Sequence, residues 1–351
     1  MTNSTTRRDL ARGLALATLA GAAVATQSDK AYAQGPRITE SAIESAVRQA
    51  HSRYAGLAEG ANADYIPALA QVPSRFFGVT VITPSGGVHS TGDDGQMFSI
   101  QSISKVFTMA QVMRESGPQR IIDTVGVDAT GQVFNSITAV EQYRGQQMNP
   151  LVNPGAIATT GNVQGATPDE KWAKIIGIHN EFAGRELQVN QAVYESESAT
   201  NQRNRAIGEL MAAYGRFSGD PAVATDLYTR QCSINVTSRD LGVMAATLAS
   251  GGRNPVTHRQ VLTPDLVAKV LAVMATAGLY DDSGLWLFRT GLPAKSGVGG
   301  GLMAVSPAKF GIGTFSPPLD QAGNSVRGQR AIEHVSGALG GNPYLVTPGM
   351  T

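Results

Sequence analysis

Apolar residues recur at helical spacing in several separate stretches of this 351-residue chain. The clearest repeat begins at Ser102 and ends where the pair Gly117-Pro118 supplies a stop. From Ser102 to about residue 248 the pattern predicts a mainly helical block. Individual amphipathic helices are predicted at residues 40–58, 195–214, 264–277 and 329–339.

Short apolar runs of the strand type lie on both sides of this helical block. Residues 75–83 and 87–92 predict a hairpin, with Pro84-Ser-Gly-Gly as its turn. Three more strands are predicted at residues 295–298, 301–305 and 310–316. Strands at both ends of a chain with helices between them indicate an α/β lobe interrupted by a helical lobe. We expect an active cleft between the two lobes.

The first 33 residues have the pattern of an export signal. Arg7 and Arg8 precede a short Ala/Leu/Gly run, and Ala31-Tyr-Ala33 fits a signal-peptidase site. Paired arginines ahead of such a run resemble a twin-arginine signal, which predicts a periplasmic or secreted protein. The run is too short to favour a stable membrane span, although an uncleaved anchor is the alternative. The predicted domain is therefore residues 34–351.

Composition and charge exclude several classes of function. A net charge of +1 without a basic cluster argues against binding nucleic acid. The single cysteine, Cys232, cannot form an intrachain disulfide and is expected to be buried in the core. The five histidines show no metal-ligand spacing, so neither a metal site nor a cofactor is predicted.

The stretch Ser102-Ile-Ser-Lys105 places a hydroxyl and an amine three residues apart. On a helix these side chains share a face, about 5–6 Å apart at their Cβ atoms. This arrangement suits a serine nucleophile with a lysine general base. The motif is short, however, and Ser306-Pro-Ala-Lys309 repeats it between two strand-like runs. Its meaning depends on companion motifs elsewhere in the chain.

One such companion is Lys295-Ser-Gly297, which precedes Val298 and a run of glycines. It resembles the K-T-G strand that faces the serine in penicillin-recognising enzymes. A second ammonium near Lys105 would lower the pKa of both lysines, and burial would act in the same direction. We therefore expect Lys105 to serve as a neutral base near pH 7. A solvated lysine on a glycine-rich hairpin is the alternative.

Seven further stretches, in the same order along residues 40–340, complete a resemblance to the serine-dependent glutaminases. This family is a branch of the serine β-lactamase and transpeptidase superfamily. The stretches are Ala63-Asp-Tyr65, Asn149-Pro-Leu-Val-Asn153, Ser196-Glu197, Arg203-Asn204, Tyr228-Thr-Arg-Gln-Cys232, Gly278-Leu-Tyr280 and Gly323-Asn-Ser-Val.

The resemblance implies an α+β fold with an antiparallel sheet flanked by helices and an inserted all-helical lobe. Residues 34–106 and 249–351 would form the α/β lobe, and residues 107–248 the helical lobe. It also implies a homodimer or homotetramer that works without a cofactor.

The resemblance further implies hydrolysis of L-glutamine to L-glutamate and ammonia through a γ-glutamyl ester. Ser102 would be the nucleophile and Lys105 the base, with Tyr228 or Tyr280 relaying a proton to the leaving ammonia. The N–H groups of Ser102 and Val298 would hold the oxyanion. The residues at the positions of the family's glutamine contacts are Tyr65, Ser102, Asn153, Glu197, Asn204, Tyr228, Tyr280 and Val298.

Two points of this implied site are open at the level of sequence. Glu197 can pair with the substrate ammonium, but Glu195 lies close by, and spacing to Asn204 favours Glu197. Taken without the resemblance, Glu197 would be read as a solvated helix charge. Pro154 also predicts extended backbone at Asn153, because proline disfavours the helical conformation of its predecessor.

Two other functions stay open beside glutamine hydrolysis. A β-lactamase or penicillin-binding enzyme is the nearest rival, since Ser233-Ile-Asn235 imitates the S-x-N element of those enzymes. A non-catalytic glutamine-binding protein is the other. The presence of both Ser102-Ile-Ser-Lys105 and Lys295-Ser-Gly297 argues against it.

Overall fold

Strands from the two ends of the chain meet in one antiparallel sheet of order β2-β1-β7-β6-β5. The computed structural model describes residues 38–345, and the predicted export signal lies outside this range. The strands are β1 (Gly78–Ile82), β2 (Val88–Gly92), β5 (Ala294–Ser296), β6 (Gly301–Ser306) and β7 (Phe310–Phe315). The central pairing joins β1 to β7, with Val81 opposite Ile312. The predicted hairpin and the α+β class with an antiparallel sheet are thus confirmed.

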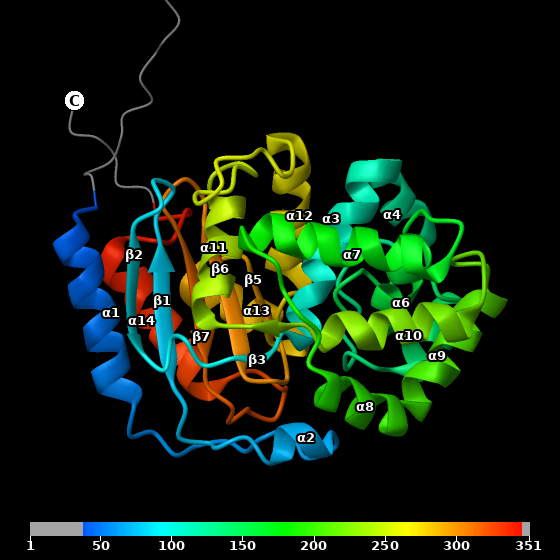
Figure 1. Ribbon diagram of the computed structural model, residues 1–351, viewed down its shortest axis with the longest axis horizontal. Coiled ribbons are helices and arrows are strands. Elements are labelled where there is room, and N and C mark those ends of the chain that lie inside the picture. Colours follow the sequence, from blue (N-terminus) through cyan, green and yellow to red (C-terminus); the bar gives the residue numbers. More distant parts are fainter. Residues whose placement is uncertain (1–37, 346–351) are drawn as a thin grey trace, which may run out of the picture. The chain divides into compact units, whose positions relative to one another are not determined.

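Helices cover both faces of this sheet (Figure 1). On one face lie α1 (Glu40–Tyr54) and α14 (Val326–Leu339), which also contact each other. On the other face, α11 (Ser238–Ala249) packs against β7, β1 and β6. Every residue of β1 and β7 is buried, as expected for strands covered on both sides.

Two glycines in β7 allow α11 to lie unusually close to the sheet. A Cβ atom at Gly311 would stand 2.1 Å from the backbone nitrogen of Ala246, and one at Gly313 would stand 2.2 Å from the carbonyl oxygen of Ser238. Real Cβ atoms do not approach so closely. The helix backbone therefore occupies the space that two side chains would fill.

The position of α11 affects the predicted division into lobes. All residues of this helix except the last, Ala249, fall within residues 107–248, the range predicted for the helical lobe, yet the helix packs on the sheet. The reason is that all its residues except one are buried, so it needs partners on every side. The two-lobe boundaries stay a prediction with this one reassignment.

The helical part is arranged around α3 (Ser104–Ser116), which is buried from its first residue through Met113. Its contacts are with α4 (Pro118–Thr124), α6 (Asn153–Gly161), α7 (Pro168–Ala183) and α12 (Pro264–Ala277). The remaining helices and strands of the described residues are α2 (Pro67–Ala70), α5 (Ile137–Tyr143), α8 (Gln191–Thr200), α9 (Gln202–Ala213), α10 (Pro221–Cys232), α13 (Ser283–Thr290), β3 (Phe98–Ser99) and β4 (Asn235–Val236). The predicted helix 195–214 is thus two helices, separated at Asn201.

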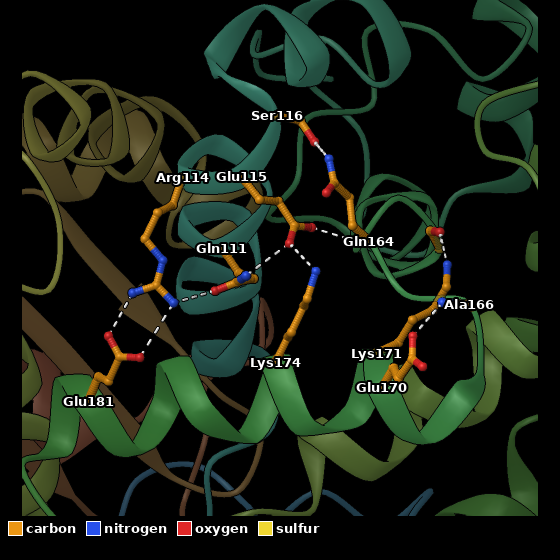
Figure 2. Close-up of polar contacts among 11 residues, drawn as sticks. Gln111, Arg114, Glu115, Ser116, Gln164, Ala166, Glu170, Lys171, Lys174 and Glu181 are labelled. Carbon is orange, nitrogen blue, oxygen red and sulfur yellow. Dashed lines mark hydrogen bonds and ion pairs between the residues drawn. The ribbon is translucent and has the colours of Figure 1, made fainter.

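A polar network fastens the C-terminal end of α3 to α7 (Figure 2). Arg114 pairs with Glu181 at 2.6 Å, and Glu115 accepts from Lys174 at 3.1 Å. Gln111 links the two by donating to Glu115 and accepting from Arg114. Such partly exposed pairs contribute little singly, but a shared network holds its members in one geometry. This end of α3 is anchored, while the other end carries Lys105.

Within residues 38–345, no helix combines the length and the apolar character that a membrane span requires.

Candidate active site

Ser102 lies in a single 3₁₀ turn, η1 (Gln101–Ile103), which leads directly into α3. The chain enters this turn from β3, which pairs with β4. Gln101 adopts a positive φ of 51°, a conformation that is costly for a residue with a side chain and that clusters at functional sites. Ser102 is 6% exposed. The predicted helix start is therefore a strained turn that presents the serine.

Lys105 lies one turn further along and is almost fully buried. Its Nζ donates to Oδ1 of Asn153 at 2.7 Å, and the hydroxyl of Tyr228 donates to the same oxygen at 3.0 Å. Nδ2 of Asn153 in turn donates to Oδ1 of Asn204 at 3.0 Å. Burial lowers the pKa of Lys105 to about 8. The groups that bond to the ammonium are neutral, and the effect of burial outweighs the charge of Glu197, which favours the protonated form.

Asn153 differs from its predicted backbone conformation. It is the first residue of α6 rather than an extended residue, with Val152 as the extended N-cap. Proline is tolerated in the first turn of a helix because its missing N–H would have no partner there. Pro154 therefore helps to start α6, and α6 presents the Asn153 amide to Lys105.

Lys295, from β5, is the second buried ammonium of the site. Its Nζ donates to the carbonyl oxygens of Gly278 and Ser296, each at 2.8 Å, and lies 4.1 Å from the ring centre of Tyr280. Burial lowers its pKa well below the usual value, and the charge of Lys105 acts in the same direction. For Lys105 itself, burial is the cause of the lowered pKa.

The two buried tyrosines remain protonated at neutral pH. Burial raises the pKa of Tyr280 to about 12, and the hydrogen bonds with Ser102 and Ser296 partly oppose this rise. Burial likewise raises the pKa of Tyr228. Both phenols can therefore donate, and the hydroxyl of Tyr280 neighbours Ser102.

Glu197, rather than Glu195, faces this site. Glu197 is 7% exposed, and one of its carboxylate oxygens accepts from Nε2 of Gln101 at 3.3 Å. Glu195 is exposed and accepts from Gln191 on the helix surface. Burial raises the pKa of Glu197 to about 7, and Lys105 partly opposes this rise. The carboxylate is placed to receive a cationic group of a ligand.

A cavity of about 740 Å³ is lined by Tyr65, Val298 and Gly323, among other residues. Tyr65 is 53% exposed at this wall, in contrast to the buried tyrosines. Within residues 38–345, the N–H groups of Ser102 and Val298 donate to no other backbone group. Both donors are available to an oxyanion.

The comparisons with known proteins agree on one family. A family model described as Glutaminase matches residues 60–344. The chain belongs to the glutaminase family. A glutaminase of Colwellia psychrerythraea is 51% identical over 302 residues, which are 86% of this chain and 97% of that protein. Glutaminase 1 of Escherichia coli is 46% identical over the same length and the same shares.

Solved structures of glutaminases share the fold. The structure of the probable glutaminase ybaS superposes with a TM-score of 0.86 at 44% identity, covering 88% of this chain and all of that one. Mglu in its glutamate form superposes with a TM-score of 0.82 at 33% identity, covering 87% of this chain and 71% of that one. The predicted fold class and the prediction that the chain is a glutaminase are both confirmed.

The motifs that imitate catalytic ones have structural roles in this glutaminase. In the second Ser-x-x-Lys pair, Ser306 donates to the carbonyl oxygen of Gly341 at 2.7 Å, and Lys309 donates to that of Gly340. Both close the C-terminal end of α14. Ser233, from the S-x-N imitation, donates to the carbonyl oxygen of Thr229 within α10.

Cys232 is buried, as predicted. Burial raises the pKa of its thiol to about 12, so the thiol is not a nucleophile. Within residues 38–345, no group of three or more His, Cys, Asp or Glu side chains could hold a metal ion.

Gln101 is the site residue that sequence reasoning missed. Its side chain joins Ser99 to Glu197, and its backbone is the strained step before Ser102. A positive φ has no signal in the sequence when the residue is neither glycine nor asparagine. The structural contact with Glu197 is the observation that reveals it.

Proposed function

We propose that this glutaminase hydrolyses L-glutamine through a γ-glutamyl ester on Ser102, with Lys105 as the general base. The observation that carries the proposal is the environment of Lys105. Its ammonium is buried, bonded to the neutral Asn153 amide, and has a pKa lowered to about 8. An amine of this kind, one helical turn from a serine hydroxyl, is an effective base near neutral pH.

In the acylation step, Oγ of Ser102 attacks the side-chain amide carbon of glutamine. Nζ of Lys105 takes the hydroxyl proton, and the carbonyl oxygen becomes an oxyanion between the N–H groups of Ser102 and Val298. Collapse of this intermediate breaks the C–N bond. The nitrogen leaves as ammonia after it receives the proton that Lys105 accepted.

Tyr280 is the better candidate for relaying that proton. Its hydroxyl neighbours Ser102 and makes only a long bond, 3.4 Å, to the carbonyl oxygen of Ser296, whereas the hydroxyl of Tyr228 donates to Asn153 at 3.0 Å. Deacylation repeats the chemistry with water. Lys105 removes a proton from the water, and the resulting hydroxide attacks the ester carbon. The ester C–O bond then breaks, and Oγ of Ser102 leaves with the proton that Lys105 returns to it. The products are glutamate and free enzyme.

Substrate recognition would rest on the buried carboxylate of Glu197. Within residues 38–345 its hydrogen-bond donor is the neutral side chain of Gln101, which bonds to one of its two oxygens. An α-ammonium group can therefore bind Glu197 through charge-assisted hydrogen bonds. Asn204 and Tyr65 would supply neutral donors to the α-carboxylate.

A turnover assay with matched serine variants tests this mechanism. Ser102→Ala is expected to abolish release of ammonia from glutamine, whereas Ser306→Ala, in the second Ser-x-x-Lys pair, is expected to retain wild-type kcat. Retained turnover in Ser102→Ala would contradict the mechanism.

The same proteins separate the rival functions. Hydrolysis of a chromogenic cephalosporin by the wild type would favour the β-lactamase alternative. Equal glutamine binding by wild type and Ser102→Ala, with turnover by neither, would favour a binding protein.

Export and assembly are separate proposals. We propose that residues 1–33 direct twin-arginine export to the periplasm or outside the cell, on the sequence pattern alone. N-terminal sequencing of the exported protein tests this, because an intact Met1 would contradict cleavage. A homodimer or homotetramer is proposed from family resemblance, and light scattering would measure it.

A further inference from the structure

The stretch Gly323-Asn-Ser-Val has no part in the mechanism above, yet it contacts the site. It lies in the loop 316–325 between β7 and α14. Asn324 is fully buried there, and its Oδ1 accepts from Oγ of Ser296 at 2.6 Å. Ser296 is the middle residue of Lys295-Ser-Gly297. A side chain from the C-terminal loop thus holds the strand that carries the second lysine.

Ser296 also bonds to two other groups of the site, the ammonium of Lys295 and the hydroxyl of Tyr280. While its hydroxyl bonds to Asn324, its carbonyl oxygen accepts from Nζ of Lys295 at 2.8 Å and from the hydroxyl of Tyr280 at 3.4 Å. Val298, whose N–H is the proposed oxyanion donor, follows two residues later. A shift of Ser296 would therefore move Tyr280, Lys295 and Val298 together.

The residue before Asn324 adds a second contact with the same groups. Gly323 has a φ of +96°, and a Cβ atom on it would lie 3.6 Å from both the ring of Tyr280 and the side chain of Val298. The loop is closed on itself by Asp320, whose N–H donates to the carbonyl oxygen of Asn324 at 2.9 Å and whose Oδ1 accepts from the Asn324 N–H at 2.9 Å. The loop is therefore a rigid wall against Tyr280 and Val298.

The hydrogen bonds of Asn324 differ from those of a structural asparagine in the same chain. Asn254, also fully buried, donates to the carbonyl oxygens of Glu181 and Phe182 and accepts from two backbone N–H groups. Nδ2 of Asn324 is buried without a partner among the described residues. A scaffold position would be expected to satisfy its amide fully. Asn324 instead uses its oxygen for Ser296 alone.

We propose that Asn324 is a positioning residue for the acyl chemistry, which it supports by fixing Ser296. The bond holds Ser296 so that the Val298 N–H and the Tyr280 hydroxyl face the carbon attacked by Ser102. This inference rests on the proposed mechanism, because the roles of Val298 and Tyr280 belong to it. Within residues 38–345 no hydrogen bond joins Asn324 to Glu197 or Asn204, so we expect binding of the amino-acid end to depend little on it.

Kinetics of Asn324→Ala, Ser296→Ala and the double variant test the proposal. We expect each single variant to lower kcat by about 10- to 100-fold, less than the roughly 10²- to 10³-fold lost when an oxyanion donor is removed altogether, with KM changed by less than about threefold. The loss of kcat in the double variant should be no greater than that in the more impaired single variant, because the two substitutions remove the same hydrogen bond. Calorimetric binding of L-glutamate should likewise weaken by less than about threefold in all three.

Asn254→Ala is the matched control, since it removes an equally buried asparagine whose hydrogen bonds go to α7 and to its own loop rather than to residues of the site. It should lower Tm and leave kcat unchanged. Wild-type kcat in Ser296→Ala or Asn324→Ala would overturn the proposal, as would losses that multiply in the double variant. Ser296→Ala removes only one oxygen, so it keeps the test decisive if Asn324→Ala fails to fold. An active Ser102→Ala would instead overturn the underlying mechanism.

Discussion

Lys105 can act as a base because no carboxylate bonds to it directly. Its hydrogen-bond acceptor is an amide oxygen, and burial favours the uncharged amine. Glu197 is buried in the same site, and burial favours its uncharged form as well. Each group therefore changes protonation near neutral pH, and each needs the deprotonated form for the role that we propose for it.

This shared requirement predicts the pH dependence of kcat/KM. The pKa of Lys105 is lowered to about 8 and that of Glu197 is raised to about 7. Activity should rise with pH through this interval, because both groups must lose a proton, and should be lost below pH 7. The two interact, so the profile reports apparent values of the pair.

Glu197→Gln identifies the contribution of the carboxylate in the same measurement. It should raise KM for glutamine and leave a profile governed by Lys105 alone. A wild-type profile that is flat between pH 6 and 9 would contradict these roles.

Some residues of the site could be predicted from the sequence and others could not. Ser102, Lys105 and Glu197 were predicted because their motifs are local or match a family pattern. The bond between Ser296 and Asn324 joins residues far apart in the chain. Serine and asparagine are common polar residues, and their type does not indicate which distant residue they bond to. The bond is therefore visible only in the folded structure.

At the scale of elements, the packing of α11 on β7 depends on glycine. Gly313→Ala places a Cβ atom against the carbonyl oxygen of Ser238, which is backbone and cannot move aside. The expected loss is about 1–3 kcal/mol of unfolding free energy, the usual cost of overpacking a core.

Gly337→Ala is the matched control for this prediction. Gly337 lies in α14, and a Cβ atom there would meet nothing within 4 Å. The substitution should stabilise the protein by about 0.5–1 kcal/mol, because alanine loses less backbone entropy in a helix. Urea denaturation measures both variants, and equal effects would contradict the packing account.

Element boundaries were less predictable than element types. The helix predicted at 329–339 begins earlier, at Val326, because Ser325 caps it by accepting from the Gly328 N–H. The helix predicted at 195–214 divides at Asn201, whose side chain bonds to Thr229 of α10. Caps and tertiary bonds of this kind do not alter hydrophobic spacing, so the pattern alone does not show them.

At the scale of the whole molecule, Arg327 fastens the C-terminal helix to the N-terminal part of the fold. Arg327 is 3% exposed, and its guanidinium donates to the carbonyl oxygens of Ser74 and Phe76 and to Oγ of Ser316. These partners flank β1 and β7, the strands through which the chain ends pair. The fork geometry of arginine serves several acceptors at once.

Arg327→Ala should therefore destabilise the entire unit. Several buried carbonyl groups would lose their donor, and we expect a loss of at least about 3 kcal/mol in unfolding free energy. Arg330→Ala is the control, because its side chain is 47% exposed and its pair with Glu333 is long, at 3.8 Å. It should change stability by less than about 0.5 kcal/mol. Similar losses in both variants, measured by calorimetry, would contradict this role.

The covalent intermediate on Ser102 is the central claim, and a γ-diazoketone analogue of glutamine tests it most directly. Such an electrophile stays attached to the attacking nucleophile, so peptide mapping by mass spectrometry identifies the residue. The account predicts label on Ser102, protection by L-glutamine, no labelling in Lys105→Ala and normal labelling in Ser306→Ala. Inactivation with the label on any other residue would contradict it.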